Sequence, residues 1–352
     1  MDDQPVYQLF VGSYPPDEET CGIYALAVDK DSGSCTIVQG NAETANPSYL
    51  LYAEGRLYAA NEQPDSAQIS SFFVDNDGSI RLVDTLFSEG AGTCQIAFSP
   101  DKTLLYGADY DSGSIAECRV HSDGSLEPGV DPVIHSGQGT DPDRQEAPHV
   151  HMVGFAPDSP ALIAVDLGID ALSAYAVGED GLSSHEPEDI LFVPAGEGPR
   201  MVAHHPTLPY TVLITELANH LIVYRRKSGE LSSWEPLATY TLVSEGYEGE
   251  ALSAHVLFSP DGRHLYASVR GPNCVVVFAV DETGALERKG EFSSGGSWPR
   301  HMALSSDATL LAVANERSDE LVIFGLDKQS GLATDEVARC PIPSPTCAVW
   351  AD

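Results

Sequence analysis

The sequence predicts an all-β fold, a seven-bladed β-propeller with four antiparallel strands per blade, and two periodic landmarks lead to this prediction. The first is a polar turn containing glycine, which recurs along the 352-residue chain at intervals of 45, 46, 57, 48, 55 and 47 residues. The second is the start of a strand rich in β-branched and aromatic residues, which recurs in step at intervals of 46, 57, 49, 54, 46 and 46 residues. A repeat of about 40 to 50 residues with four strands is typical of a propeller blade.

The landmark residues define each repeat. The turn glycines are Gly33, Gly78, Gly124, Gly181, Gly229, Gly284 and Gly331. The inner strands begin at Ser48, Cys94, His151, Arg200, Ala254, Arg300 and Thr346. One full repeat has strands at 254–260, 264–270 and 273–280, followed by a weaker strand near 286–292.

The two ends of the chain supply complementary parts of one blade. The first repeat lacks an innermost strand, and the last repeat is followed by one further strand at residues 345–352. We expect this strand to pair with residues 6–14 and close the ring, because closure removes the free edge that a partial sheet would expose. Residues 1–352 are therefore predicted to form a single domain.

The chain is strongly acidic, and this excludes one class of function. It has 53 Asp and Glu residues against 18 Lys and Arg residues, a formal net charge of -35. Nucleic-acid binding rests on a basic surface, so no nucleic-acid partner is expected. The acidity favours solubility, and adaptation to a salty cell interior is the alternative explanation, since such charge density repels itself unless it is screened.

Neither a membrane segment nor a disulfide framework is expected. No stretch approaches the roughly 18 apolar residues that cross a bilayer. The first residues, MDDQPVYQLF, lack the basic and apolar regions of a signal peptide, so the expected location is the cytoplasm. The seven cysteines form no CxxC or CxxH pair, and their odd number in a large chain favours reduced, mostly buried thiols.

Candidate site residues follow from the geometry of a blade. In a four-stranded antiparallel sheet, the start of the innermost strand and the end of the second strand lie at the same end, beside the central channel. The candidates near the starts of inner strands are His149, His151, Arg200, His255, Arg300 and His301. Those at the ends of second strands are Glu62, Asp109, Asp166, Glu216, Arg270 and Glu316. All are predicted to share one face of the ring.

Two long connections are predicted to cover this face. From turn glycine to the next inner strand the chain takes 15 to 19 residues in five repeats, but 27 before His151 and 25 before Ala254. The first insertion contains the segment RQEAPHVH at residues 144–151, which adds Arg144 to the candidates.

An ordered set of segments carries a family resemblance over essentially the whole chain. The segments are RQEAPHVH (144–151), VDLG (165–168), GPRMVAHHP (198–206), TEL (215–217), AHVLFSPDGRHLYASVRG (254–271) and WPRHMALSSDATLLAVANERSD (298–319). Together they resemble the seven-bladed β-propeller lactonases, a family that includes bacterial 6-phosphogluconolactonases of the propeller type and fungal carboxymuconate-cyclising enzymes. The resemblance implies lactone hydrolysis or its reverse in the central cleft, without a metal or cofactor, with histidine, arginine and glutamate as the working groups.

The expected substrate is a small anionic lactone, first of all 6-phospho-D-glucono-1,5-lactone. Its hydrolysis needs a base for water, a group that stabilises the oxyanion and an acid for the leaving ring oxygen. We expect His151 or Glu216 to act as the base, with His149 in reserve, and Arg200 to stabilise the oxyanion.

The other candidates are expected to bind the substrate. Arg200, Arg270 and Arg300 form the predicted anion receptor, because a planar guanidinium suits a phosphate or carboxylate and the overall negative charge repels anions. The further substrate-binding candidates are Arg144, His301, His255, Glu316, Asp166 and Glu62. The protein is expected to be a monomer or a weak homodimer.

Several alternatives stay open at this point. Arg200 and Glu216 could form an ion pair within one blade, and the alternate positions of His149 and His151 also suit a metal. Asp166 could cap a strand end, and Glu62 and Glu316 could bond to neighbouring backbone at the rim. For the whole protein, the alternatives are a carboxymuconate-type lactonising enzyme and a non-catalytic binding scaffold.

Overall fold

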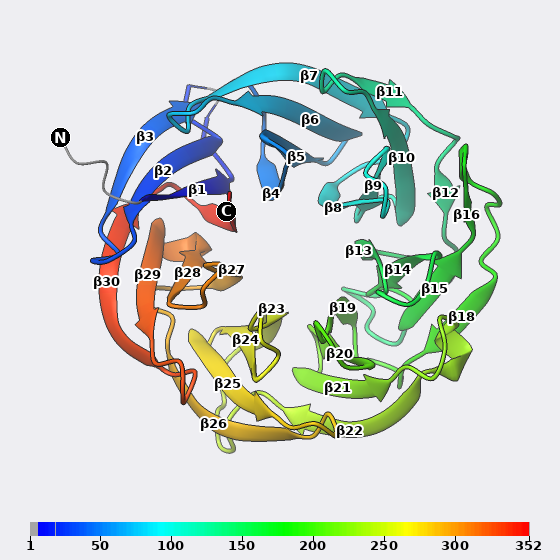
Figure 1. Ribbon diagram of the computed structural model, residues 1–352. Helices are drawn as coiled ribbons and strands as arrows, with labels where there is room; N and C mark the ends of the chain where they lie inside the picture. Colours follow the sequence, from blue (N-terminus) through cyan, green and yellow to red (C-terminus); the bar gives the residue numbers. More distant parts are fainter. Residues whose placement is uncertain (1–5, 18, 352) are drawn as a thin grey trace.

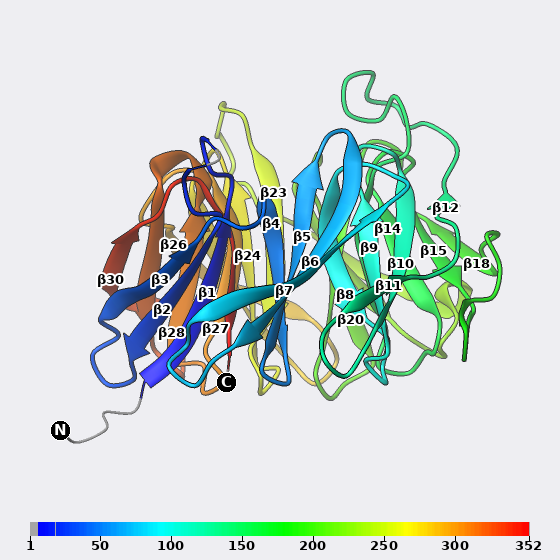
Figure 2. The same cartoon turned by 90° about the horizontal axis from the view of Figure 1, so that it is seen from above.

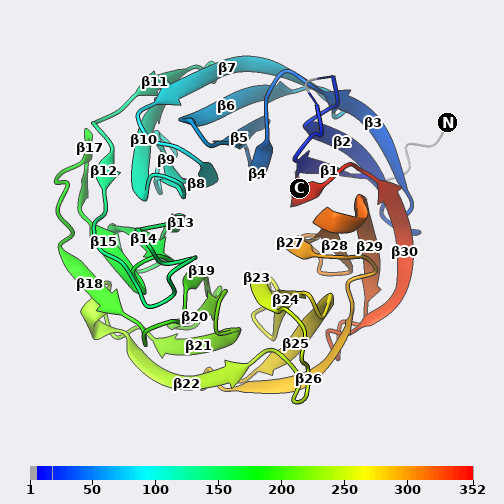
Figure 3. The ribbon, with the colours of Figure 1, turned by 180° about the vertical axis from the view of Figure 1, so that it is seen from behind.

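The computed structural model describes residues 6–17 and 19–351, and it confirms the predicted seven-bladed propeller (Figure 1). Seven antiparallel sheets of four principal strands each stand around a central axis. Seen from the opposite side, the innermost strands of the blades surround the axis (Figure 3).

The strands follow the repeat from blade to blade. The closing blade contains β31 (Pro345–Trp350), β1 (Val6–Ser13), β2 (Ile23–Asp29) and β3 (Cys35–Asn41). The next two blades contain β4 (Pro47–Ala53), β5 (Arg56–Gln63), β6 (Ser66–Val74) and β7 (Ile80–Ser88), then β8 (Thr93–Phe98), β9 (Leu104–Asp109), β10 (Ser114–Val120), β11 (Leu126–Pro128) and β12 (Val133–Ile134). The blade after them contains β13 (Val150–Phe155), β14 (Leu162–Asp166), β15 (Ala171–Tyr175) and β18 (Asp189–Phe192), with a small ribbon of β16 (Val177–Gly178) and β17 (Gly181–Leu182).

The last three blades continue this order. They contain β19 (Pro199–His204), β20 (Tyr210–Thr215), β21 (His220–Arg225) and β22 (Glu235–Thr241), then β23 (Leu252–Phe258), β24 (His264–Arg270), β25 (Cys274–Val280) and β26 (Leu286–Ser293), then β27 (Pro299–Leu304), β28 (Leu310–Asn315), β29 (Glu320–Leu326) and β30 (Ala333–Pro341). The short 3-10 turns are η1 (Leu231–Ser233) and η2 (Glu316–Ser318). No helix among the described residues is long and apolar enough to span a membrane.

The hydrophobic core lies between neighbouring blades. Because strand residues alternate between the two faces of a sheet, each blade presents apolar side chains to both of its neighbours. Val165 of β14 and Leu213 of β20, for example, are fully buried in one cluster that joins two blades. This packing fixes the inner strands relative to one another, and they in turn position the channel side chains.

The ring closes as predicted, by pairing of its two ends. Strand β31 pairs antiparallel with β1, and Leu9 stands opposite Trp350. The rings of Tyr7 and Trp350 meet edge to face with centroids 5.6 Å apart. The confirmed closing strand ends at Trp350, and residues 1–5 and 352 lie outside the described part.

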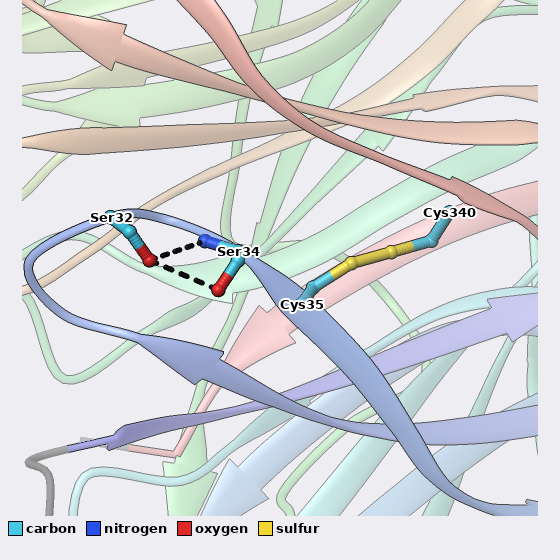
Figure 4. Close-up of a disulfide and its surroundings, with 4 residues drawn as sticks. All are labelled: Ser32, Ser34, Cys35 and Cys340. Carbon is cyan, nitrogen blue, oxygen red and sulfur yellow. Dashed lines mark hydrogen bonds between the residues drawn. A yellow bond between two sulfur atoms is a disulfide. The ribbon is translucent and has the colours of Figure 1, made fainter.

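A disulfide corrects the expectation that all the cysteines are reduced. Cys35 on β3 is bonded to Cys340 on β30, which joins the outer strands of the closing blade and its neighbour (Figure 4). These residues are 305 positions apart and form no recognisable spacing motif, and only closure of the ring brings them together. The five other cysteines are free thiols, and four of them are buried.

Both long connections protrude on the same side of the ring. Figure 2 shows the segment between β12 and β13 and the segment before β23 rising above that side. The insertions therefore stand over one face, as their lengths predicted.

Candidate active site

Each inner strand carries a bulge close to its first residue. The pairing with the adjacent strand shifts at this point in all seven blades, for example between Val150 and Met152 of β13 and between Pro199 and Met201 of β19. A bulge leaves a residue out of the ladder and re-aims its side chain. The residues at the bulges are Ser48, Cys94, His151, Arg200, Ala254 with His255, Arg300 and Thr346, and all of them line one hollow in the centre of the ring.

The central channel consists of two adjoining hollows. We call the first the inner hollow; it is small, with a volume of about 30 Å³, and is lined by the bulged residues and their neighbours. The second, the mouth, has a volume of about 280 Å³. The mouth is lined by Glu62, Cys94, Tyr110, Arg144, His151, Arg200, Glu216, Arg270 and Arg300. Four of these residues, Cys94, His151, Arg200 and Arg300, line both hollows.

Glu216 lies at the centre of an arginine cluster in the mouth. Its Oε1 atom is 2.6 Å from Nη2 of Arg144, and its Oε2 atom is 2.9 Å from Nη2 of Arg270. Nη1 of Arg200 also bonds to Oε2. Burial alone would raise the pKa of Glu216, but Arg270, Arg200 and the other positive groups hold this pKa well below its ordinary value. Glu216 is therefore a fully engaged carboxylate ion.

His151 faces this cluster from the neighbouring blade. Its Nε2 atom contacts Nη1 of Arg200, and its ring meets that of Tyr110 edge to face at 5.5 Å. Burial and the nearby Arg200 hold the pKa of His151 well below its ordinary value. The imidazole is therefore neutral, and because a guanidinium can only donate, Nε2 acts as the acceptor in this contact.

Arg300 forms a second cluster on the other side of the mouth. Its Nη2 atom donates to the hydroxyl of Tyr14 at 2.7 Å and lies 3.4 Å from Oε2 of Glu62, while Nη1 lies 3.4 Å from Oε2 of Glu316. The Tyr14 hydroxyl in turn donates to Glu62 at 2.5 Å. The two clusters contain four guanidinium groups and three carboxylates, so the pair carries a surplus of one positive charge in a chain of net charge -35.

Two further predicted histidines line the inner hollow. The ring centroids of His255 and His301 are 3.8 Å apart, and His301 meets Tyr49 edge to face. Burial and the positive charges of Arg200 and Arg300 lower the pKa of His301 to about 3. Burial also lowers the pKa of His255 well below its ordinary value, so both rings are neutral.

Two of the predicted site residues that lie outside the hollows, His149 and Asp166, contact the long connection instead. His149 stacks on Tyr110, and its Nδ1 atom bonds to the Tyr110 carbonyl at 2.9 Å. Asp166 is fully buried, accepts backbone N–H groups from His149 and Gly168 and pairs with His135 at 2.7 Å. Both therefore hold the long connection in place, and for Asp166 this matches the capping alternative.

Two other predicted residues, Arg270 and Glu316, have local structural roles as well. Arg270 donates from Nε to the Leu252 carbonyl at 3.1 Å and from Nη2 to the Ser253 carbonyl at 3.2 Å. Glu316 opens η2 and bonds to Arg300 without lining either hollow. Of the predicted set, the channel therefore brings together Arg144, Arg200, Arg270, Arg300, His151, His255, His301, Glu62 and Glu216.

Some channel residues were not predicted from the sequence. Tyr14 and Tyr110 sit just beyond the ends of strands, where only the folded ring shows their reach. Ser48, Cys94 and Thr346 stand at the predicted strand starts, and this repeat position was the signal that could have identified them. Within residues 6–17 and 19–351, no three His, Cys, Asp or Glu side chains are grouped to hold a metal ion.

The family of the chain follows from its match to known proteins. Residues 8–350 match the family described as "Lactonase, 7-bladed beta-propeller". The chain belongs to this lactonase family. The resemblance seen in the sequence is confirmed, and family membership makes the chain a carboxylic-ester hydrolase.

This lactonase aligns over almost its whole length with relatives whose names are known. It is 29% identical over 347 residues to the 6-phosphogluconolactonase of Bacillus subtilis, with 97% of each chain covered. A putative 6-phosphogluconolactonase from Bacteroides fragilis has a similar structure, with a TM-score of 0.91, 29% identity and 99% of each chain covered. The periplasmic gluconolactonase of Pseudomonas aeruginosa is similar too, with a TM-score of 0.90, 29% identity and 99% of each chain covered.

Proposed function

We propose that this lactonase hydrolyses the lactone of an anionic sugar acid, with 6-phospho-D-glucono-1,5-lactone as the first substrate to test. The observation that carries the proposal is the convergence of four arginines on one channel of a strongly acidic protein. Such a local reversal of charge attracts an anion that the rest of the surface repels. The name of the Bacillus subtilis relative supports the phosphorylated substrate.

His151 is the proposed general base. In the structure Arg200 donates to the lone pair of Nε2, so the guanidinium must first turn from this atom to the bound lactone. The freed Nε2 atom then accepts a proton from a water molecule as the water oxygen attacks the lactone carbonyl, and Arg200 stabilises the oxyanion of the tetrahedral intermediate. When the bond between the carbonyl carbon and the ring oxygen breaks, the proton passes from His151 to the ring oxygen. The single product is the open-chain hydroxy acid.

Glu216 is better suited to positioning the arginines than to acting as the base. Both of its oxygens are engaged by guanidinium groups, and its low pKa makes it a weak proton acceptor. An anionic substrate near His151 raises the low pKa of the imidazole, because a negative charge favours the protonated form. Substrate binding therefore strengthens the proposed base at the moment of reaction.

The test is a pH-stat assay of the purified protein. It compares freshly generated 6-phosphogluconolactone, unphosphorylated gluconolactone and a muconolactone at the same concentrations. The proposal expects acid release from the sugar lactones, with the highest kcat/KM for the phosphorylated one. Preference for the muconolactone would favour a carboxymuconate-type reaction, and no acid release from any of the three would favour a binding scaffold.

We also propose that the enzyme acts in the cytoplasm. The bond between Cys35 and Cys340 would then be an exception, because disulfides are rare in the cytosol. Fractionation of cells that make the protein should recover it together with cytoplasmic marker enzymes. Recovery with periplasmic or secreted proteins would contradict a cytoplasmic location.

We further propose that the lactonase is a monomer or a weak homodimer. Its most exposed large apolar side chains are spread over the outer strands of different blades, with Phe87 on β7, Ile134 on β12 and Phe192 on β18. Light scattering at two protein concentrations tests this assignment. A dimer that persists at nanomolar concentration would contradict it.

A further inference from the structure

Arg144 reaches the mouth from a loop, unlike the other residues that line it. Among the described residues around the mouth, it is the one that lies neither within a strand nor next to one. It belongs to the connection between β12 and β13, which rises above the ring in Figure 2. From there its Nη2 atom donates to Oε1 of Glu216 at 2.6 Å and to the hydroxyl of Tyr110 at 3.3 Å, so it joins residues of two other blades.

An arginine on a long connection binds an anion well only if its backbone is held in place. The guanidinium ends a long side chain with many rotamers, and a loose connection would add the entropy cost of ordering the backbone. A binding group that is held in position before the ligand arrives avoids much of this cost. An anchor beside Arg144 would therefore increase the affinity of the mouth for an anion.

Gln145, the next residue along the chain, has the contacts of such an anchor. Its side chain is fully buried, and its Oε1 atom accepts the backbone N–H groups of Thr140 and Asp141 at 3.0 and 3.1 Å. Its Nε2 atom donates to the carbonyl of Leu167, just beyond the end of β14, at 2.8 Å. One side chain therefore closes the turn that precedes it and ties this turn to the blade.

The backbone of the same turn is closed by further hydrogen bonds. The N–H of Gly139 donates to the Gln145 carbonyl, and the N–H of Gln145 donates to the Asp141 carbonyl, both at 2.9 Å. The Asp141 carboxylate accepts the N–H groups of Asp143 and Arg144 at 2.9 and 3.1 Å. A Cβ atom at Gly139 would lie 2.5 Å from Cδ of Gln145, so the turn packs directly on the glutamine. These contacts fix the backbone from which the guanidinium of Arg144 extends.

We propose that Gln145 is a positioning residue, which sets the affinity of the mouth for the anionic group of a ligand by holding Arg144 in place. The inference rests on the proposed function, which assigns Arg144 to the anion. Gln145 itself lines neither hollow, so it acts through the arginine and not by touching the ligand. When its side-chain bonds are lost, the turn is freed in the unbound protein, and the cost of ordering it again weakens binding.

A double-mutant cycle on anion binding tests this role without relying on catalysis. Isothermal titration measures the Kd of 6-phosphogluconate for the wild type, Gln145→Met, Arg144→Ala and the double variant. Arg144→Ala should weaken binding at least about tenfold, since it removes a charge-assisted contact. Gln145→Met keeps the length of the side chain without its hydrogen bonds and should weaken binding at least about fivefold. In the Arg144→Ala background the same change should cost less than about twofold, because no arginine is left to position.

Two more variants separate positioning from a general loss of stability. Gly139→Ala pushes the Gln145 side chain aside and should weaken binding in the same Arg144-dependent way. Gln39→Met is the matched control: Gln39 lies on the outer strand β3, and its side-chain amide exchanges hydrogen bonds of 2.9 and 2.6 Å with the backbone of Ile80. This control loses the same kind of bonds away from the channel, so it should melt at a lower temperature but bind 6-phosphogluconate as the wild type does.

The outcomes distinguish the positioning role from the proposed reaction. Unchanged affinity in Gln145→Met and Gly139→Ala, or an equal loss in both backgrounds, would overturn the role, because the glutamine would then not act through Arg144. A wild-type protein that does not bind 6-phosphogluconate, or an Arg144→Ala variant that binds it as tightly as the wild type, would overturn it too, even if lactones are hydrolysed. If the cycle shows the coupling but the pH-stat detects no lactone hydrolysis, the positioning role stands and the proposed reaction fails.

Discussion

Arg200 on strand β19 donates a hydrogen bond from Nη1 to Nε2 of His151 on the neighbouring strand β13. The two residues occupy the same bulge position in adjacent blades, and this repeat geometry brings them together. The contact occupies the lone pair of the neutral imidazole, so this bond must break before Nε2 can accept a proton. It also means that an anion drawn to Arg200 arrives beside the proposed base.

The first prediction concerns Glu216. Glu216→Gln removes the carboxylate charge shared by Arg144, Arg200 and Arg270 and should lower the free energy of unfolding by about 3–5 kcal/mol, since it leaves buried charges unpaired. Chemical denaturation measures the change. The control Glu235→Gln breaks an exposed pair with Lys227 and should change stability by less than about 1 kcal/mol. Equal stability of the two variants would contradict the central role of Glu216 in the cluster.

The second prediction concerns anion binding in the mouth. Arg144 is the most exposed of the channel arginines, at 34% of its side chain, and it comes from the long connection. Arg144→Lys should raise KM for a phosphorylated lactone by about tenfold with little change in kcat, because a point charge replaces a planar fork. Steady-state kinetics on gluconolactone provides the comparison. An equal rise in KM for the unphosphorylated lactone would show that Arg144 does not bind the phosphate.

Arg270→Lys is a separate test of the predicted anion receptor. Arg270 already donates to Glu216 and to two backbone carbonyls, so the substitution should disturb the strand ends as well as substrate binding. Unchanged KM and kcat, measured on the preferred lactone, would remove this residue from the site.

The third prediction concerns ring closure. Deletion of residues 345–352 removes β31, which provides Thr346 to the channel and pairs along β1. The truncated protein should be insoluble or melt at a much lower temperature, because the closing sheet loses its inner strand. A truncated protein that melts like the full chain would contradict closure by this strand.

The disulfide gives a milder test of closure. Cys340→Ser should lower the free energy of unfolding by a few kcal/mol, since a cross-link over a long loop restricts the unfolded chain. Thermal melts with and without reductant measure the effect. Cys21→Ser, which changes a half-buried free thiol, is the control: it keeps the disulfide and should lose stability in reductant as the wild type does, whereas Cys340→Ser should melt alike in both conditions. A Cys340→Ser variant as stable as the oxidised wild type would show that the bond does not stabilise the ring.

The fourth prediction concerns pH and Asp109. Burial raises the pKa of this carboxyl to about 7, although Thr93 and Ser114 donate to it. In the unfolded chain the carboxyl ionises near pH 4. The group therefore stabilises the fold fully below about pH 4, and this contribution is lost as the pH rises to about 7. The stability of Asp109→Asn relative to the wild type should rise over this range; a pH-independent difference would contradict the raised pKa.

The repeat pattern of the sequence located more of the residues that line the channel than the chemical type of each residue did. The seven strand starts read from the period, from Ser48 to Thr346, coincide with the bulges that line the inner hollow. Only the chemically distinctive members, such as His151 and Arg200, were singled out beforehand. Ser48 and Thr346 are ordinary residue types, so only their position in the repeat marks them in the sequence.

Contacts between distant segments could not be predicted from the sequence of single repeats. Arg144 reaches Glu216 from a long connection, and Cys35 meets Cys340 only after the ring has closed. A period defines the position of a residue within its blade. It does not define how far a loop side chain extends toward the next blade.

The kcat of His151→Gln on the preferred lactone shows whether His151 is the general base. We expect a loss of at least about 10²-fold, the usual contribution of a general base, with an unchanged melting temperature. His204→Gln is the matched control, because His204 is a histidine outside the hollows that bonds to Thr211, and it should retain nearly full kcat. If His151→Gln retains the full wild-type kcat, His151 is not the base and the channel must be assigned a different role.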